Sequence, residues 1–143
     1  MSEDLDDDLV PACGSDDVSV VVHWEHDGPG LRGQVLAENV SGHVCRLANK
    51  PDVTPLRVDG KPLRVRTIMT LEWREPGYVD LQPGQRAGAP LSWGSWCGLP
   101  ASDQAQVVWP GGSAVAQVTG PTQPECVDGQ SSNLTTDWFH VIE

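Results

Sequence analysis

The sequence predicts an all-β fold, specifically a two-sheet antiparallel β-sandwich of immunoglobulin-like type with two disulfides and little or no helix. Three observations lead to this prediction. Short stretches of alternating apolar and polar residues recur along the 143 residues, 15 Gly and 12 Pro separate them, and the four cysteines form an even set. No segment free of Gly and Pro carries the apolar period of a helix over three turns.

The first two strands are expected to form a hairpin. In residues 17–25, Val18, Val20, Val22 and Trp24 share one face, and the other face is polar except for Val21, as in a half-buried strand. The turn sequence DGPG follows at 27–30, and residues 31–40 supply the returning strand.

The middle of the chain predicts edge strands. Pro51 and Pro55 exclude a helix from residues 44–58 and suit an edge or irregular strand. A turn at 58–63 then leads into a strand within residues 65–73.

The remaining strands are separated by further turns. They are expected within 78–96, divided by a turn at 82–84, within 105–119, divided at 110–112, and at the end of 135–143. Residues 101–109 are also compatible with a short helical turn.

The charge limits the partners and the domain organisation. A formal net charge of -11 with only 9 Lys and Arg argues against nucleic-acid binding, which needs clustered cations. The acidic run near the start predicts a disordered acidic linker over residues 1–11. A single β-sandwich domain is then expected over residues 12–143.

The four cysteines indicate disulfides. Cys13, Cys45, Cys97 and Cys126 contain no C-x-x-C pair, so zinc ribbons and zinc fingers are not favoured. Three pairings are possible, and the spacing alone leaves them open. Because disulfides persist in oxidising compartments, the set predicts an extracellular or cell-envelope location.

The start of the chain does not display the signal that export requires. It lacks a positive n-region and an apolar h-region, and no apolar run approaches the roughly 20 residues of a transmembrane helix. We interpret Met1 as a start that replaces a removed signal or lipid-anchor segment.

A metal site formed by histidines and Cys45 is the alternative to a disulfide. His43 lies two positions before Cys45, and His23 and His26 could join them in a copper or zinc site. On one continuous strand, His23 and His26 point to opposite faces, so they converge only if the chain turns after His26. Otherwise no cofactor is expected.

The order of short motifs resembles a known domain family. The landmarks are Cys13, Asn39-Val40-Ser41, Cys45-Arg46-Leu47, Pro51, Asp59-Gly60, Leu81-Gln82-Pro83-Gly84, Ala87, Leu91-Ser92-Trp93, Cys97 and Cys126. Over residues 12–142 the chain resembles an uncharacterised domain family of exported and lipid-anchored envelope proteins of actinobacteria. One departure is that the family's glycine between C-x-L and the proline is replaced by Ala48-Asn49-Lys50.

The resemblance implies a β-sandwich, export, and the pairing of Cys13 with Cys45 and of Cys97 with Cys126. It supplies no catalytic residues. Within the N-x-S landmark, we interpret Asn39 as the cap of a turn.

The tryptophans are the candidate binding residues. Six in a chain with one Phe and one Tyr are many, and Trp24, Trp93 and Trp138 are expected in the core. Trp73, Trp96 and Trp109 adjoin charged or turn residues, and exposed rings there could contact a protein or a glycan.

These observations predict a non-enzymatic binding module of the cell envelope whose partner is a protein or a glycan. No G-x-S-x-G elbow, H-E-x-x-H or phosphate-binding loop is present; the nearest string is WGSWCG around Ser95. An uncharacterised hydrolase is the remaining hypothesis, and it requires a pocket that joins a histidine to a serine or a carboxylate.

Overall fold

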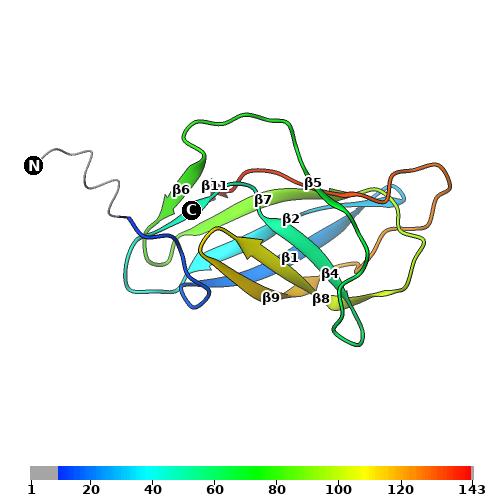
Figure 1. Ribbon diagram of the computed structural model, residues 1–143, viewed down its shortest axis with the longest axis horizontal. Helices are drawn as coiled ribbons and strands as arrows, with labels where there is room; N and C mark the ends of the chain where they lie inside the picture. Colours follow the sequence, from blue (N-terminus) through cyan, green and yellow to red (C-terminus); the bar gives the residue numbers. More distant parts are fainter. Residues whose placement is uncertain (1–9, 143) are drawn as a thin grey trace, which may run out of the picture.

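The computed structural model describes residues 10–142, which form eleven β-strands and no helix. The strands are β1 (Val18–Asp27), β2 (Gly30–Asn39), β3 (Cys45–Ala48), β4 (Asp52–Arg57), β5 (Thr67–Met69), β6 (Tyr78–Leu81), β7 (Arg86–Trp93), β8 (Ala101–Trp109), β9 (Gly112–Thr119), β10 (Leu134–Thr136) and β11 (His140–Val141). Figure 1 shows their arrangement. The all-β class is therefore confirmed. Residues 1–9 of the predicted linker lie outside the described residues.

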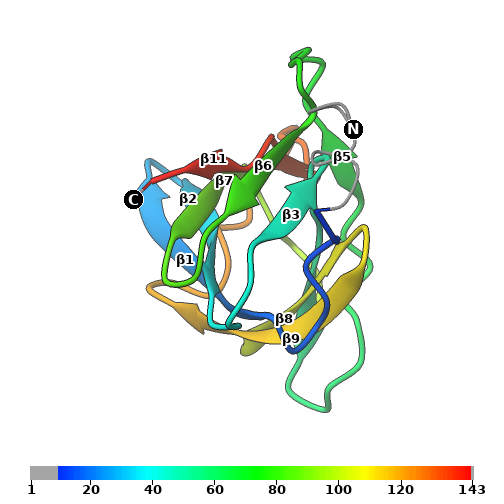
Figure 2. The same ribbon diagram turned by 90° about the vertical axis from the view of Figure 1, so that its left-hand side faces the viewer.

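Nine strands form one mixed sheet that curls on itself. Its order is β4-β8-β9-β1-β2-β7-β10-β5, and β11 also pairs with β7. The pairs β1–β9 and β5–β10 are parallel. The hydroxyl of Thr67 on β5 donates to the carbonyl of Val53 on β4 at 2.6 Å, so the two end strands approach each other. Figure 2 shows the resulting barrel-like curve, with the short β3–β6 sheet in front of it.

The architecture thus differs from the expected antiparallel sandwich of two sheets. A nearly closed mixed sheet with a two-stranded second sheet replaces two antiparallel sheets packed face to face. The reason is that hairpin signals determine which neighbouring strands pair, whereas the parallel β1–β9 pair joins strands remote in the chain.

Local predictions agree with the structure in most strands. β1 and β2 form the expected hairpin, with Asp27 opposite Gly30 and Gly28 at a φ of 60° in the turn. The prediction of a helical turn at 101–109 was wrong, because these residues form β8, which pairs with β4 on one side and β9 on the other. Within residues 10–142 there is no helix long and apolar enough to span a membrane.

The core fills the inside of the curved sheet and the space under β3–β6. Trp24 and Trp93 lie in it as expected, with ring centroids 6.2 Å apart. Leu47 and Leu81 of the small sheet belong to the same buried cluster. The small sheet is therefore packed on the large one by apolar contacts, whose burial is favourable.

The structure contains the disulfides Cys13–Cys45 and Cys97–Cys126, the pairing that the resemblance implies. Their surroundings differ. Both cysteines of the first are fully buried, whereas those of the second are exposed. The first bridge fixes the segment before β1 to β3, where Pro11 and Cys13 also bond to the backbone of Arg46.

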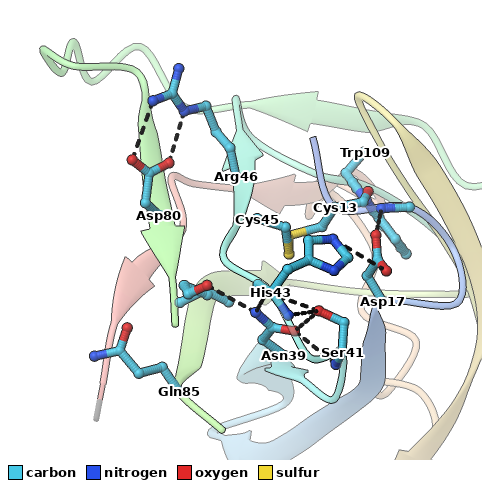
Figure 3. The surroundings of a disulfide bond; sticks show 12 residues. Cys13, Asp17, Asn39, Ser41, His43, Cys45, Arg46, Asp80, Gln85 and Trp109 are labelled. Carbon is cyan, nitrogen blue, oxygen red and sulfur yellow. Dashed lines mark hydrogen bonds and ion pairs between the residues drawn. A yellow bond between two sulfur atoms is a disulfide. The ribbon is translucent and has the colours of Figure 1, made fainter. Parts of the chain in front are cut away.

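A buried asparagine connects two of the family landmarks, Asn39-Val40-Ser41 and Leu81-Gln82-Pro83-Gly84, beside the first disulfide (Figure 3). Asn39 is 1% exposed, and its amide donates to the carbonyls of His43 and Leu81, both at 2.9 Å. Its carbonyl oxygen accepts from the backbone amide and the hydroxyl of Ser41. The interpretation of Asn39 as a turn cap is confirmed, and the side chain additionally fixes the loop after β2 to the end of β6.

We predict that Asn39→Ala lowers the free energy of unfolding by about 3 kcal/mol, because it removes the buried hydrogen bond to the Leu81 carbonyl and the acceptor of the Ser41 amide and hydroxyl. Chemical denaturation would measure this loss. The matched control is Asn133→Ala, at the second N-x-S/T sequence, which we expect to change stability by less than about 0.5 kcal/mol. Equal effects of the two substitutions would contradict the role of Asn39.

The different burial of the two disulfides predicts different rates of reduction in the native state. Thiol–disulfide exchange requires access to a sulfur, so Cys97–Cys126 is expected to be reduced at least about tenfold faster than Cys13–Cys45. Timed treatment with reductant, followed by alkylation and peptide mapping, would measure both rates. Equal rates would show that the buried bridge is not protected by the fold.

Candidate functional site

The three candidate tryptophans lie in different surroundings. Trp73 is 80% exposed. Trp96 is half-buried against Trp93, with centroids 5.9 Å apart, and its indole donates to the carbonyl of Leu99. Trp109 is buried and donates to the carbonyl of Cys13 at 2.8 Å, so the expectation that it is exposed was wrong.

Trp73 lies on a protruding segment between β5 and β6. We call residues 70–77 the Trp73 arch; Figures 1 and 2 show it standing away from the body of the molecule. Leu71 is fully exposed and Met69, just before the arch, is 51% exposed. Alternate residues of this segment therefore present apolar side chains to solvent. A group of neighbouring exposed apolar side chains is rare on protein surfaces that bind nothing.

Buried Lys50 holds the inner side of the arch. Its side chain is only 8% exposed, and its ammonium donates to the carbonyls of Thr70 and, at 2.8 Å, of Glu72. The ammonium also lies 4.8 Å from the ring centroid of Trp138, a cation–π contact. A charge removed from water needs such partners, so the arch and Lys50 depend on each other.

Two further side chains attach the arch to the end of the chain. The indole of Trp138 donates to the carbonyl of Glu72 at 2.9 Å. The guanidinium of Arg74 donates to the carbonyl of Phe139. The arch is thus bound at its inner side while Leu71 and Trp73 stay exposed.

The sequence after β3 brings Lys50 under the arch. Asn49 has a φ of 63°, a conformation that glycine and asparagine tolerate best. It lies in the Ala48-Asn49-Lys50 segment that replaces the family's glycine. Its backbone amide donates to the carbonyl of Gly77 at 2.9 Å, which fixes the far end of the arch.

Two open grooves adjoin the arch and share Trp138. The larger, of about 550 Å³, is lined by Lys50, Met69, Trp109 and Trp138 among others. Trp109 thus contributes to the site from the buried side. Trp138, which we expected in the core, is only half-buried because it forms the wall between the two grooves.

The smaller groove, of about 310 Å³, contains the groups that the hydrolase hypothesis requires in one place. Glu72, Asp137 and His140 all line it. Within residues 10–142, however, His140 forms no hydrogen bond or ion pair with either carboxylate. A histidine that acts as a general base is usually oriented by such a partner.

The structure does not bring the metal candidates together. His23 contacts Thr119 and Glu25. Although the chain turns after Asp27, both His23 and His26 lie on the continuous strand β1 before that turn, at positions that point to opposite faces. His43 lies 3.8 Å from Asp17, immediately before β1. His26 is nine residues further along this extended segment, or about 30 Å away, so His43 and His26 lie far apart. No group of three His, Cys, Asp or Glu in the described part of the chain could hold a metal ion.

Trp96 marks a second, separate surface at the exposed disulfide. It lines a small groove of about 190 Å³ with Arg57, Arg64 and Leu99. Gly98 lies against its ring so closely that an added Cβ would be 2.5 Å from it. The ring is therefore packed in place rather than free to stack on a ligand.

The family comparison agrees with the resemblance of the motifs. The model described as "Domain of unknown function (DUF4232)" matches residues 13–140, so the chain belongs to this family. No curated protein and no solved structure gives a significant match. The landmarks that include Asn39, Cys45 and Leu81 lie together at one corner of the fold, whereas residues 70–77 of the Trp73 arch belong to none of the landmarks.

We predict that Lys50→Met loosens the arch. The substitution keeps much of the aliphatic chain but removes the charged donor, and hydrogen bonds to charged groups contribute about 1.5–3 kcal/mol. Hydrogen–deuterium exchange should become faster at the Thr70 and Asn49 amides, which bond to Thr136 and Gly77 at the two ends of the arch, and stay unchanged in β1 and β2. The control is exposed Lys61→Met; unchanged exchange of these two amides in Lys50→Met would contradict the anchoring role.

Proposed function

We propose that this DUF4232 domain is a non-catalytic binding module of an exported cell-envelope protein, and that the Trp73 arch is its contact surface. The observation that carries the proposal is the exposure of Leu71 and Trp73 on a segment anchored by Lys50, Arg74 and Trp138. Tryptophan is the residue type most enriched at binding hot spots. A surface that is ordered before binding loses less entropy when a partner binds.

A protein is the favoured class of partner. Glycan recognition uses flat aromatic rings with polar groups around them, and Trp73 alone could serve it. Leu71 and Met69 offer branched and flexible aliphatic groups, which fit an apolar pocket or side chain of a protein instead. The larger groove beside them gives such a side chain a place to lie.

Export is supported by the two disulfides, which form and persist in oxidising compartments. The envelope location, the actinobacterial source and a lipid anchor rest on the resemblance of the motifs. They remain part of the proposal.

The proposal predicts that ligands selected on the intact protein depend on the arch. Random peptides displayed on phage, and a glycan array in parallel, would be selected against the wild-type protein. We expect selected peptides to bind Trp73→Ala and Leu71→Ser at least about 30-fold more weakly, which corresponds to the loss of one hot spot.

The matched control is Val58→Ser, which changes an equally exposed apolar residue on the 57–62 turn. It should leave the affinity unchanged. Peptides that bind the arch variants and the wild type equally would overturn the proposal, and ligands found only among glycans would assign the surface to sugars.

A further inference from the structure

At the Trp73 arch the cations are bound within the protein, whereas the carboxylates form no ion pairs with other residues in the range 10–142. Its two cations, Lys50 and Arg74, donate to internal carbonyls. The carboxylates of Glu72 and Glu75 on the arch and of Asp52 in the larger groove are exposed, and that of Asp137 lines the smaller groove. Within the described residues, none of these four carboxylates forms an ion pair.

The site therefore presents apolar side chains surrounded by unpaired negative charge. The nearest preceding exposed cation in the chain is Arg66, six residues before Glu72, or about 20 Å along an extended segment. A partner group that approaches Leu71 and Trp73 meets these carboxylates at the same time. Complementary charge would both attract a basic partner and exclude an acidic one.

The backbone of the arch also has unused hydrogen-bonding groups. The amide of Thr70 donates to the carbonyl of Thr136 and so continues the β5–β10 ladder by one residue. Beyond it, the backbone groups of Leu71 and Trp73 form no hydrogen bond with the rest of residues 10–142. Free backbone groups next to a strand edge are a template for an added extended segment.

We propose that the Trp73 arch binds an extended, basic segment of a partner protein, in which apolar side chains alternate with Lys or Arg. The apolar side chains would contact Leu71, Trp73 and the larger groove. The cations would lie near Glu72 and Asp137. This inference rests on the proposed binding function and specifies the chemistry of the partner.

A second copy of the chain fits the same surface poorly. The formal net charge is -11, and a symmetric contact through the arch would place its carboxylates opposite one another. The charge therefore favours a partner of different composition over self-association.

The test uses short acetylated peptides that alternate valine with lysine, with serine or with glutamate. Calorimetric titration of the intact, disulfide-bonded protein is expected to show about tenfold tighter binding of the lysine peptide than of the serine peptide, and no binding of the glutamate peptide. The affinity for the lysine peptide should fall as salt increases. Amide chemical shifts of Leu71 and Trp73 should change on binding.

Two double variants separate local from general charge effects. Glu72→Gln with Asp137→Asn should reduce the preference for lysine over serine to about twofold or less. This double variant keeps the backbone carbonyl of residue 72 that Lys50 contacts. The asparagine side chain at position 137 also keeps an oxygen that can accept from the Trp138 amide. Glu25→Gln with Asp128→Asn removes the same charge from exposed positions outside both grooves and should keep the preference.

The outcomes distinguish this inference from the proposed function. Equal affinities of the three peptides, loss of preference in both double variants, or no binding of any peptide at about 1 mM would overturn the basic-segment inference. In each case, selected ligands that depend on Leu71 and Trp73 would still support the binding function. Concentration-dependent dimerisation abolished by Trp73→Ala would assign the surface to a second copy instead.

Discussion

The hydrogen bonds from the buried Lys50 ammonium to the carbonyls of Thr70 and Glu72 determine what this protein presents to its surroundings. A lysine in such a place is unfavourable unless its donors are satisfied, and the arch supplies the acceptors. In return, the ammonium keeps the arch close to the sheet, together with the hydrogen bonds of Trp138 and Arg74. The exposed positions of Leu71 and Trp73 follow from this mutual dependence, since the carbonyls of Thr70 and Glu72 are bound on the inner side of the arch.

The family landmarks have a different role, which is structural. Asn39, Ser41, Cys45 and Leu81 meet at one corner, where amide hydrogen bonds and the buried disulfide connect the small sheet to the large one. None of these groups faces the grooves beside Trp73. These four residues therefore belong to the scaffold, and the contact surface that we propose lies on a loop between its strands, as is common in binding domains.

The sequence predicted the strands better than their arrangement. The β1–β2 hairpin followed from local turn chemistry, whereas the parallel pairing of β1 with β9 depends on contacts between remote segments. In the same way, Trp73 could be predicted as a candidate from its charged neighbours. The burial of Trp109 could not, because its indole partner is the carbonyl of Cys13, far away in the chain. One feature of the sequence pointed to the region of Lys50: the family's glycine is replaced by a segment that includes Asn49, a residue suited to positive φ.

The central claim is that the arch is held in its exposed conformation before any partner binds. The most direct measurement is ¹⁵N relaxation of the backbone amides of residues 70–75 in the free protein, compared with those of β1 and β2. The account predicts order parameters near those of the strands, about 0.85. Values below about 0.6 in the arch would show a mobile loop that Lys50 does not hold, and would contradict the account.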